Sequence, residues 1–309
     1  MKNVSGKKEE FLSALLGERT VEKTAGIAFS AAVVFPTLLA LLFVVIGGAF
    51  GAFEEGYENA DWYRYFNFLI PQIAYALVAT LFFYLSKLPV KELTGKLSPK
   101  YFLIAFLLQF GLFSLSEINA VFIKFLENFG YENTPIQIPS LDGFGLVGVL
   151  LTVAVLPAVF EEIVFRGIVL RGLKPFGSAF AVLLCGALFA VFHQNPAQTV
   201  YQFCCGAAFA LLALRSKSVF PTMLAHFLNN AAVILLTKFG SPVLPTPVTV
   251  AFFVLSAVSL VAALVSLVFF DKNGNPERDK RRGMHFLLFA SVGLLVCVLS
   301  WFANFFGGI

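Results

Sequence analysis

Nine long apolar runs, separated by short polar segments, restrict the fold of this 309-residue chain more than any other feature. They cover residues 25–52, 66–88, 101–125, 143–172, 178–194, 197–214, 219–238, 246–270 and 286–307. A run of about 18 or more apolar residues can cross the hydrocarbon core of a bilayer as a helix. We therefore expect an all-α fold, a polytopic bundle of about eight or nine transmembrane helices. The runs 178–194 and 197–214 are short and closely joined, so eight spans with a re-entrant hairpin are the alternative.

The composition is typical of a membrane protein, because 59% of the residues are hydrophobic and only 13% are charged. In soluble domains about 45–50% of the residues are apolar and about 25% are charged. A net charge of +4 gives no reason to expect nucleic acid as a partner. The first apolar run is longer than a signal-peptide core of about 7–15 residues, so we expect an uncleaved first span. The four cysteines lie in apolar runs without CxxC spacing and are interpreted as packing residues.

The segment 127–145 carries turn residues and separates the first three spans from the rest. It suggests a division into three parts. Residues 1–142 hold an N-terminal segment and three spans, residues 143–240 hold a core with most of the polar groups, and residues 241–309 hold two C-terminal spans.

The basic residues indicate an orientation, because Lys and Arg accumulate on the cytoplasmic side of a membrane. With the N-terminus inside, all 22 Lys and Arg residues fall inside except Arg64, Lys124 and Lys238. The same alternation places the C-terminus outside. We expect an integral protein of the bacterial plasma membrane.

Charged side chains in a bilayer are costly, so each one is a functional hypothesis. The fourth run contains Glu161, Glu162 and Arg166. Glu162 and Arg166 are four residues apart, share a helix face and are expected to pair. Glu161 points about 100° away and has no partner on its own helix, so we interpret it as a general base. The alternative is that all three side chains lie in water at the cytoplasmic end of the helix.

Two further apolar runs carry polar residues that could act together with Glu161. One ends with Phe189 and His193, and the other contains His226, Asn229 and Asn230. A histidine and a carboxamide can donate hydrogen bonds to a developing oxyanion or hold a water. Hydrogen bonds between membrane helices are the alternative role for such residues. His193 converges with the others only if the uncharged turn at 193–198 lies below the outer surface, lined by protein.

The three segments resemble the signatures of a known family. "EEIVFR" at 161–166, "FAVFH" at 189–193 and "HFLNN" at 226–230 are similar to EExxxR, FxxxH and HxxxN. These motifs occur in this order in the CPBP intramembrane proteases, a family that includes CAAX prenyl endopeptidases and bacteriocin-processing and abortive-infection proteins. The resemblance covers about 143–240, and the flanking spans match only in being hydrophobic.

The resemblance implies an all-helical membrane endopeptidase whose site lies within the bilayer. Glu161 with His193 would activate a water, and His226 with Asn230 would hold the oxyanion of the tetrahedral intermediate. Four further positions are expected to support these groups: Glu162, Arg166, Phe189 and Asn229.

A metal is the open question of the expected chemistry. Zinc sites usually have three protein ligands and an open position, which Glu161, His193 and His226 would provide if a metal is present. The sequence contains no HExxH helix. We favour glutamate chemistry that requires no cofactor, with zinc as the alternative.

A non-catalytic membrane protein is the alternative function, either an immunity or regulatory scaffold or a transporter. Transporters often have inverted repeats or paired broken helices, which the sequence does not show clearly. A degenerate scaffold is expected to have lost a motif residue, and this chain keeps all of them. We therefore expect membrane lipid and a peptide or lipidated protein substrate as partners. The sequence does not say whether that substrate is prenylated.

Overall fold

The computed structural model describes residues 20–51, 53, 56–134, 136–240, 244–270 and 278–307. Within these ranges the chain has no strand, and eight helices are long and apolar enough to cross a membrane, which confirms an all-α polytopic bundle. The spans are Val21–Ala49 (α2), Asp61–Ser86 (α3), Pro99–Glu127, Gly145–Phe176, Pro196–Ser216, Phe220–Phe239 (α12), Thr246–Phe269 and Lys280–Gly307 (α14). Within the composite spans lie α5 (Pro99–Leu112), α6 (Ser116–Glu127), α11 (Thr199–Ser216) and α13 (Thr246–Val265).

The remaining predicted run forms α10, Ser178–Phe192, which has 15 residues. Such a helix rises about 22 Å and is shorter than the hydrocarbon core of about 30 Å. It packs along α11, in agreement with the closely joined pair expected from the sequence. Gly186 and Gly206 allow the close approach, because a Cβ on Gly206 would lie 2.8 Å from the Gly186 Cα.

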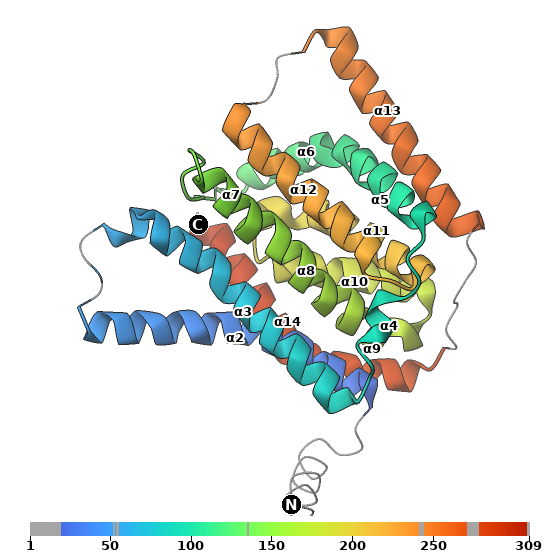
Figure 1. Ribbon diagram of the computed structural model, residues 1–309, viewed down its shortest axis with the longest axis horizontal. Coiled ribbons are helices and arrows are strands. Elements are labelled where there is room, and N and C mark those ends of the chain that lie inside the picture. The colour runs from blue at the N-terminus through green and yellow to red at the C-terminus, as the bar shows by residue number, and fades with distance from the viewer. Residues whose placement is uncertain are drawn as a thin grey trace, which may run out of the picture.

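The motif-bearing helices lie in the middle of the bundle (Figure 1). Helices α2, α3 and α14 cover one side of them, and α5, α6 and α13 lie toward the other side. Each flank joins elements that are far apart in the sequence, since α2 packs along α14 and α5 packs against α13. The helices α2 and α14, from opposite ends of the sequence, therefore form one flank of the middle helices together.

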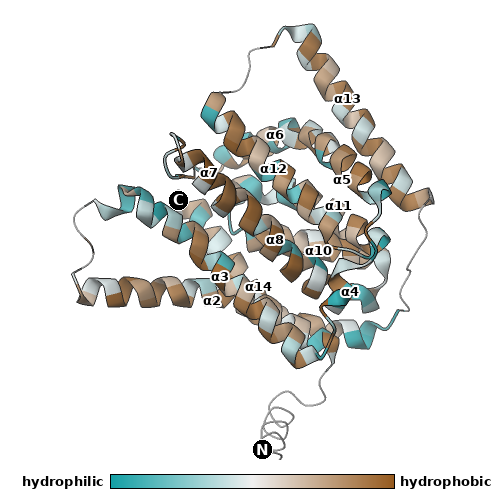
Figure 2. Ribbon diagram, in the orientation of Figure 1, coloured by the Kyte–Doolittle hydropathy of each residue, from teal (hydrophilic) through white to brown (hydrophobic). Residues whose placement is uncertain are grey.

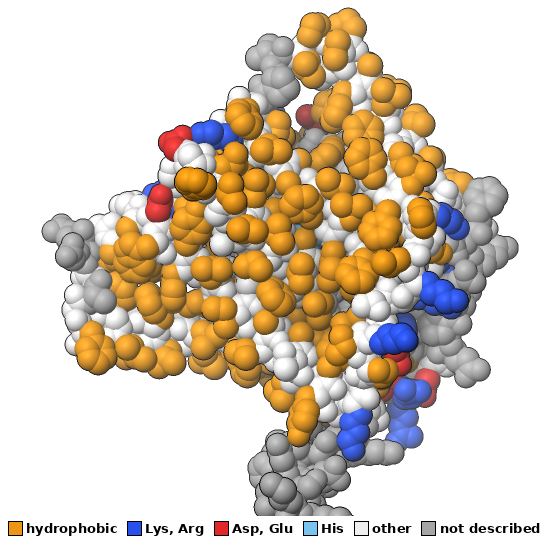
Figure 3. All heavy atoms as spheres, in the orientation of Figure 1, with side chains coloured by type: hydrophobic (Ala, Val, Ile, Leu, Met, Phe, Trp, Pro, Cys, Tyr) orange, Lys and Arg blue, Asp and Glu red, His pale blue; other side chains and the backbone are white. Residues whose placement is uncertain are grey.

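The outer surface is mostly apolar. Figure 2 shows hydrophobic residues along nearly every long helix, and Figure 3 shows hydrophobic side chains over the broad face, with the visible charged groups gathered near its edges. Leu41, Leu255 and Leu288 are examples of large apolar side chains that are more than half exposed. So much exposed apolar surface is unfavourable in water and suits contact with lipid.

The fourth span changes its winding around the two glutamates. It consists of α7 (Gly145–Val149), a π-helical segment at Leu150–Val155, α8 (Leu156–Glu162), a second π-helical segment at Ile163–Val169, and α9 (Leu170–Leu173). Pro157 has no N–H and deprives the Val153 carbonyl, four residues earlier, of its α-helical donor. The Asn230 Nδ2 donates to this carbonyl at 3.0 Å. The irregular winding thus creates a specific link from the fourth span to α12.

The turn after α10 is held by side chains from two other helices. Asn119 of α6 donates to the Ala197 carbonyl at 2.9 Å, and Asn304 of α14 donates to the Gln194 carbonyl at 2.8 Å. The Asn195 side chain accepts from the Ala197 N–H at 2.9 Å. These bonds satisfy irregular backbone as a protein-lined turn requires. Its depth in the bilayer and the orientation of the chain remain predictions.

Candidate active site

Glu162 is the centre of the polar cluster. Its Oε1 accepts from Arg166 Nη1 at 2.7 Å and from His226 Nδ1 at 2.9 Å. The side chains of Glu162 and Arg166 are completely buried. The predicted pair between Glu162 and Arg166 is therefore present, and these two groups do not lie in water. The bond to His226 also joins the first motif to the third.

Arg166 is enclosed by backbone and aromatic rings. Its Nη2 donates to the Gly206 carbonyl of α11 at 3.2 Å. The guanidinium carbon lies 4.5 Å from the ring centroid of Phe189 and 5.3 Å from that of Phe209. Cation–π attraction is strongest in such desolvated surroundings. These contacts hold Arg166 in one position beneath Glu162.

Phe189 connects the second motif to the other two. Its ring centroid lies 4.7 Å from that of His193 and 6.0 Å from that of His226, with both pairs in edge-to-face geometry. The phenylalanine therefore packs against both imidazoles as well as against Arg166. This gives a physical reason for an aromatic residue four positions before His193.

Hydrogen bonds assign the proton on each imidazole. His193 Nδ1 lies 2.7 Å from the Phe189 carbonyl, which can only accept, so Nδ1 carries the proton. His226 Nδ1 likewise faces the Glu162 carboxylate at 2.9 Å. In the neutral rings Nε2 is then the acceptor on both histidines, and both Nε2 atoms are free to act on a reacting group.

The two asparagines form a chain of amides. Asn229 Nδ2 donates to Asn230 Oδ1 at 3.1 Å, and Asn230 Nδ2 donates to Val153 as described above. Asn229 Oδ1 accepts from Gln109 Nε2 at 3.0 Å and from the Tyr201 hydroxyl at 2.9 Å. These donors fix the direction of both amides. One hydrogen on Asn230 Nδ2 remains for a further acceptor.

Glu161 has quite different surroundings. Its Oε2, like that of Glu162, is buried without a hydrogen-bond partner among the described residues. Unlike Glu162, Glu161 forms no ion pair within the described ranges, and the Gln72 side chain of α3 interacts with its carboxylate. The carboxylate also interacts electrostatically with His226, Glu162 and Arg166. No direct hydrogen bond joins it to His193, although the structure describes both residues. Side chains from α3, α12 and its own span thus surround Glu161, while its Oε2 stays unpaired.

Three polar residues of this cluster are absent from the sequence prediction: Gln72, Gln109 and Tyr201. All three lie in apolar runs, and both glutamines are buried. An uncharged amide in an otherwise apolar span is the signal that could have identified Gln72 and Gln109. Tyrosine gives no such signal, because Tyr is common in apolar runs.

The described residues contain no group of three or more His, Cys, Asp or Glu side chains arranged to hold a metal ion. Glu161, His193 and His226 therefore do not form a ready-made ligand set in this conformation. The free Nε2 atoms of the two histidines are nevertheless of the right chemical type for zinc. Metal dependence remains a prediction from the sequence.

A mostly apolar cavity of about 610 Å³ adjoins the amide chain. Asn229 and Tyr201 contribute to its wall, together with phenylalanines from α5 and α13 and aliphatic side chains from α12. The cavity is large enough for apolar side chains or part of a lipid chain, since ligand pockets span about 300–1,000 Å³.

Residues 143–232 match the family model described as type II CAAX prenyl endopeptidase Rce1-like. The match agrees with the resemblance to the CPBP family and covers all three motifs. It supports a membrane protease of the CAAX endopeptidase type. No curated protein and no solved structure matches the chain.

Proposed function

We propose that this protein is an intramembrane endopeptidase that hydrolyses a peptide bond of a membrane-associated or lipidated substrate. The observation that carries the proposal is the convergence of three motifs from the fourth span, α10 and α12 on one buried cluster. Glu162 bonds His226, and Phe189 packs against His193 and His226. Separate structural roles for the three motifs would not require this contact.

In the proposed mechanism Glu161 is the general base. Its unpaired Oε2 can accept a proton from a water, while Gln72 holds the carboxylate. His193, with its proton on Nδ1, offers Nε2 as a second acceptor for the same water. The water oxygen attacks the peptide carbonyl, and the abstracted proton is later delivered to the leaving amine.

His226 and Asn230 are proposed to stabilise the negative charge on the carbonyl oxygen. Asn230 has one N–H left for this purpose. His226 donates from Nε2 only when its ring is doubly protonated, because Nδ1 already donates to Glu162. Glu162 and Arg166 hold His226 in place through these bonds and act here as positioning residues.

The apolar cavity beside Asn229 supports a substrate with a hydrophobic part. It lies next to the proposed oxyanion site, which is linked to it through the bond between Asn229 and Asn230. An apolar side chain or lipid group bound there would be close to the peptide bond being cleaved. A non-catalytic scaffold would not need this cavity.

The test is cleavage of a fluorogenic membrane-anchored peptide by the purified full chain. Glu161→Gln removes the base and keeps the side chain's size, so we expect a rate loss of about 10²- to 10⁴-fold. Glu117→Gln, at an exposed position on α6, is the matched control and should keep the wild-type rate. If the mechanism requires no metal, treating the wild type with a chelator should also leave the rate unchanged. Wild-type turnover by Glu161→Gln would refute the proposed base.

A further inference from the structure

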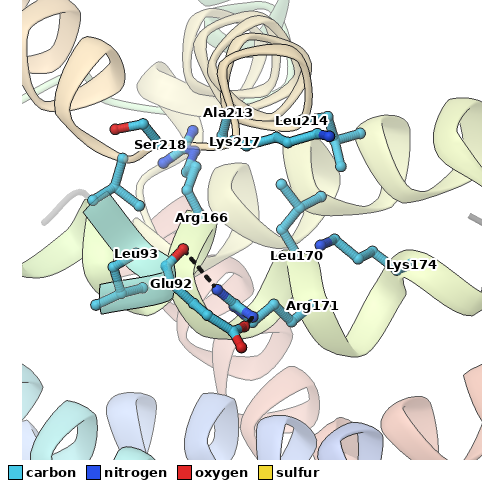
Figure 4. Close-up of a pocket in the computed structure, with 11 residues that line it drawn as sticks. Glu92, Leu93, Arg166, Leu170, Arg171, Lys174, Ala213, Leu214, Lys217 and Ser218 are labelled. Carbon is cyan, nitrogen blue, oxygen red and sulfur yellow. Dashed lines mark hydrogen bonds and ion pairs between the residues drawn. The ribbon is translucent and has the colours of Figure 1, made fainter. Parts of the chain in front are cut away.

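A second cavity, of about 360 Å³, lies at the end of the bundle that the charge pattern assigns to the cytoplasm (Figure 4). It lies between α4 (Lys91–Thr94), the end of the fourth span and the connection from α11 to α12. Four cationic side chains line it, and Glu92 is the single carboxylate among the described residues of its wall. The cations are Arg166, Arg171, Lys174 and Lys217.

The positive charge of this cavity is only partly compensated. Arg171 donates to the Glu92 carboxylate at 2.6 Å and to its carbonyl at 3.1 Å, as Figure 4 shows. Neither Lys174 nor Lys217 forms an ion pair with a carboxylate within the described ranges. The two ammonium groups are thus available to an anion.

Arg166 adds an independent observation. The residue is only 4% exposed, it contributes to the cavity wall, and its Nε has no hydrogen-bond acceptor. Its Nη1 and Nη2 are already bonded to Glu162 and Gly206. A buried guanidinium donor without an acceptor is costly, and an oxygen of a bound anion would satisfy it.

We propose that this cavity binds a phosphate group, and specifically the phosphate of an anionic lipid headgroup. Guanidinium and ammonium groups together are the usual protein partners of phosphate. Leu93, Leu170 and Val219 add apolar surface beside the cations, as a site for a lipid requires. Basic pockets between transmembrane helices on the cytoplasmic side bind such headgroups. Free inorganic phosphate offers the same chemistry from another source.

The experiment measures binding to the detergent-solubilised full chain, so its result does not depend on peptide cleavage. The probes are short-chain phosphatidylglycerol, phosphatidylcholine of the same chain length, and inorganic phosphate. We expect phosphatidylglycerol to bind more tightly than phosphatidylcholine. In Lys174→Gln/Lys217→Gln its affinity should fall roughly 30-fold, about 1 kcal/mol for each lysine.

Lys91→Gln/Lys96→Gln is the matched control, because it removes the same charge from two exposed lysines that do not line the cavity. Its affinity for phosphatidylglycerol should stay within about twofold of the wild type, since neither ammonium group lines the cavity and exposed charges contribute little. Equal losses in the two double variants, or no loss in either, would overturn the proposal. Equally tight binding of inorganic phosphate, with the same loss in the cavity variant, would support the phosphate site and overturn the lipid assignment.

Discussion

Glu161 and Glu162 are neighbours on α8, yet their surroundings are opposite. Glu162 Oε1 receives two hydrogen bonds, one from a buried arginine and one from a histidine. Both residues keep a buried Oε2 without a hydrogen-bond partner, but Glu161 forms no ion pair among the described residues. A helix turns about 100° per residue, so adjacent carboxylates meet different helices. The comparison teaches that one carboxylate organises the cluster through two charged partners, while the other, the proposed base, has none.

The largest expected effect is the loss of folding stability when the Glu162 carboxylate is removed. Glu162→Gln leaves the buried Arg166 charge without its counter-charge, and losing one member of a buried ion pair costs about 3–5 kcal/mol of folding stability. Thermal unfolding in detergent should therefore occur at a markedly lower temperature than for Glu161→Gln. The matched double variant Glu162→Gln/Arg166→Met removes both charges and should recover most of the stability. Equal stability of Glu161→Gln and Glu162→Gln would show that the two carboxylates do not differ in this way.

Phe189→Leu comes next, because it removes the ring that packs on Arg166 and both histidines. A desolvated cation–π contact contributes about 2 kcal/mol or more. We expect a comparable loss of stability together with a fall in kcat, since both imidazoles lose their packing. Phe180→Leu is the control on the same helix, because Phe180 is 62% exposed. A kcat for Phe189→Leu no lower than that of Phe180→Leu would contradict the positioning role.

Gln72→Leu tests the surroundings of Glu161, the proposed base. Gln72 is a polar side chain of α3 that interacts with the Glu161 carboxylate. Polar contacts to charged groups contribute up to about 1.5–3 kcal/mol, so its loss should lower kcat by roughly tenfold. KM should change little, since Gln72 does not line the apolar cavity. Gln109→Leu is the matched comparison. It should have the smaller effect, because Tyr201 also donates to Asn229 Oδ1. The reverse order would mean that the amide chain, and not Glu161, limits the rate.

The fold could be predicted further than the site. Every apolar run became a helix, because backbone groups in lipid must be satisfied within the helix. The pair of Glu162 and Arg166 followed from spacing alone. The interaction between Gln72 and Glu161 could not, since it depends on how α3 packs against the fourth span. The bond from Asn230 to Val153 depends on the missing N–H of Pro157 together with the position of α12, and spacing within one helix contains neither.

The smallest effect is expected at Asp142 and Lys238. Their exposed ion pair can be compared with the buried pair of Glu162 and Arg166. Asp142 and Lys238 link the segment just before the fourth span to α12, the helix that carries His226, and the ion pair, at 2.7 Å, is exposed to solvent. The hydrogen bond and charge of Lys238 lower the pKa of Asp142 below its usual 3.8. A lowered folded-state pKa stabilises the protein above the unfolded pKa, and that contribution is lost as the pH falls below about 4.

Unfolding temperatures of wild type and Asp142→Asn should therefore differ slightly at neutral pH and converge in acid. Solvent screening keeps the difference well below that of Glu162→Gln. A difference as large as that of the buried pair would mean that burial does not distinguish the two ion pairs.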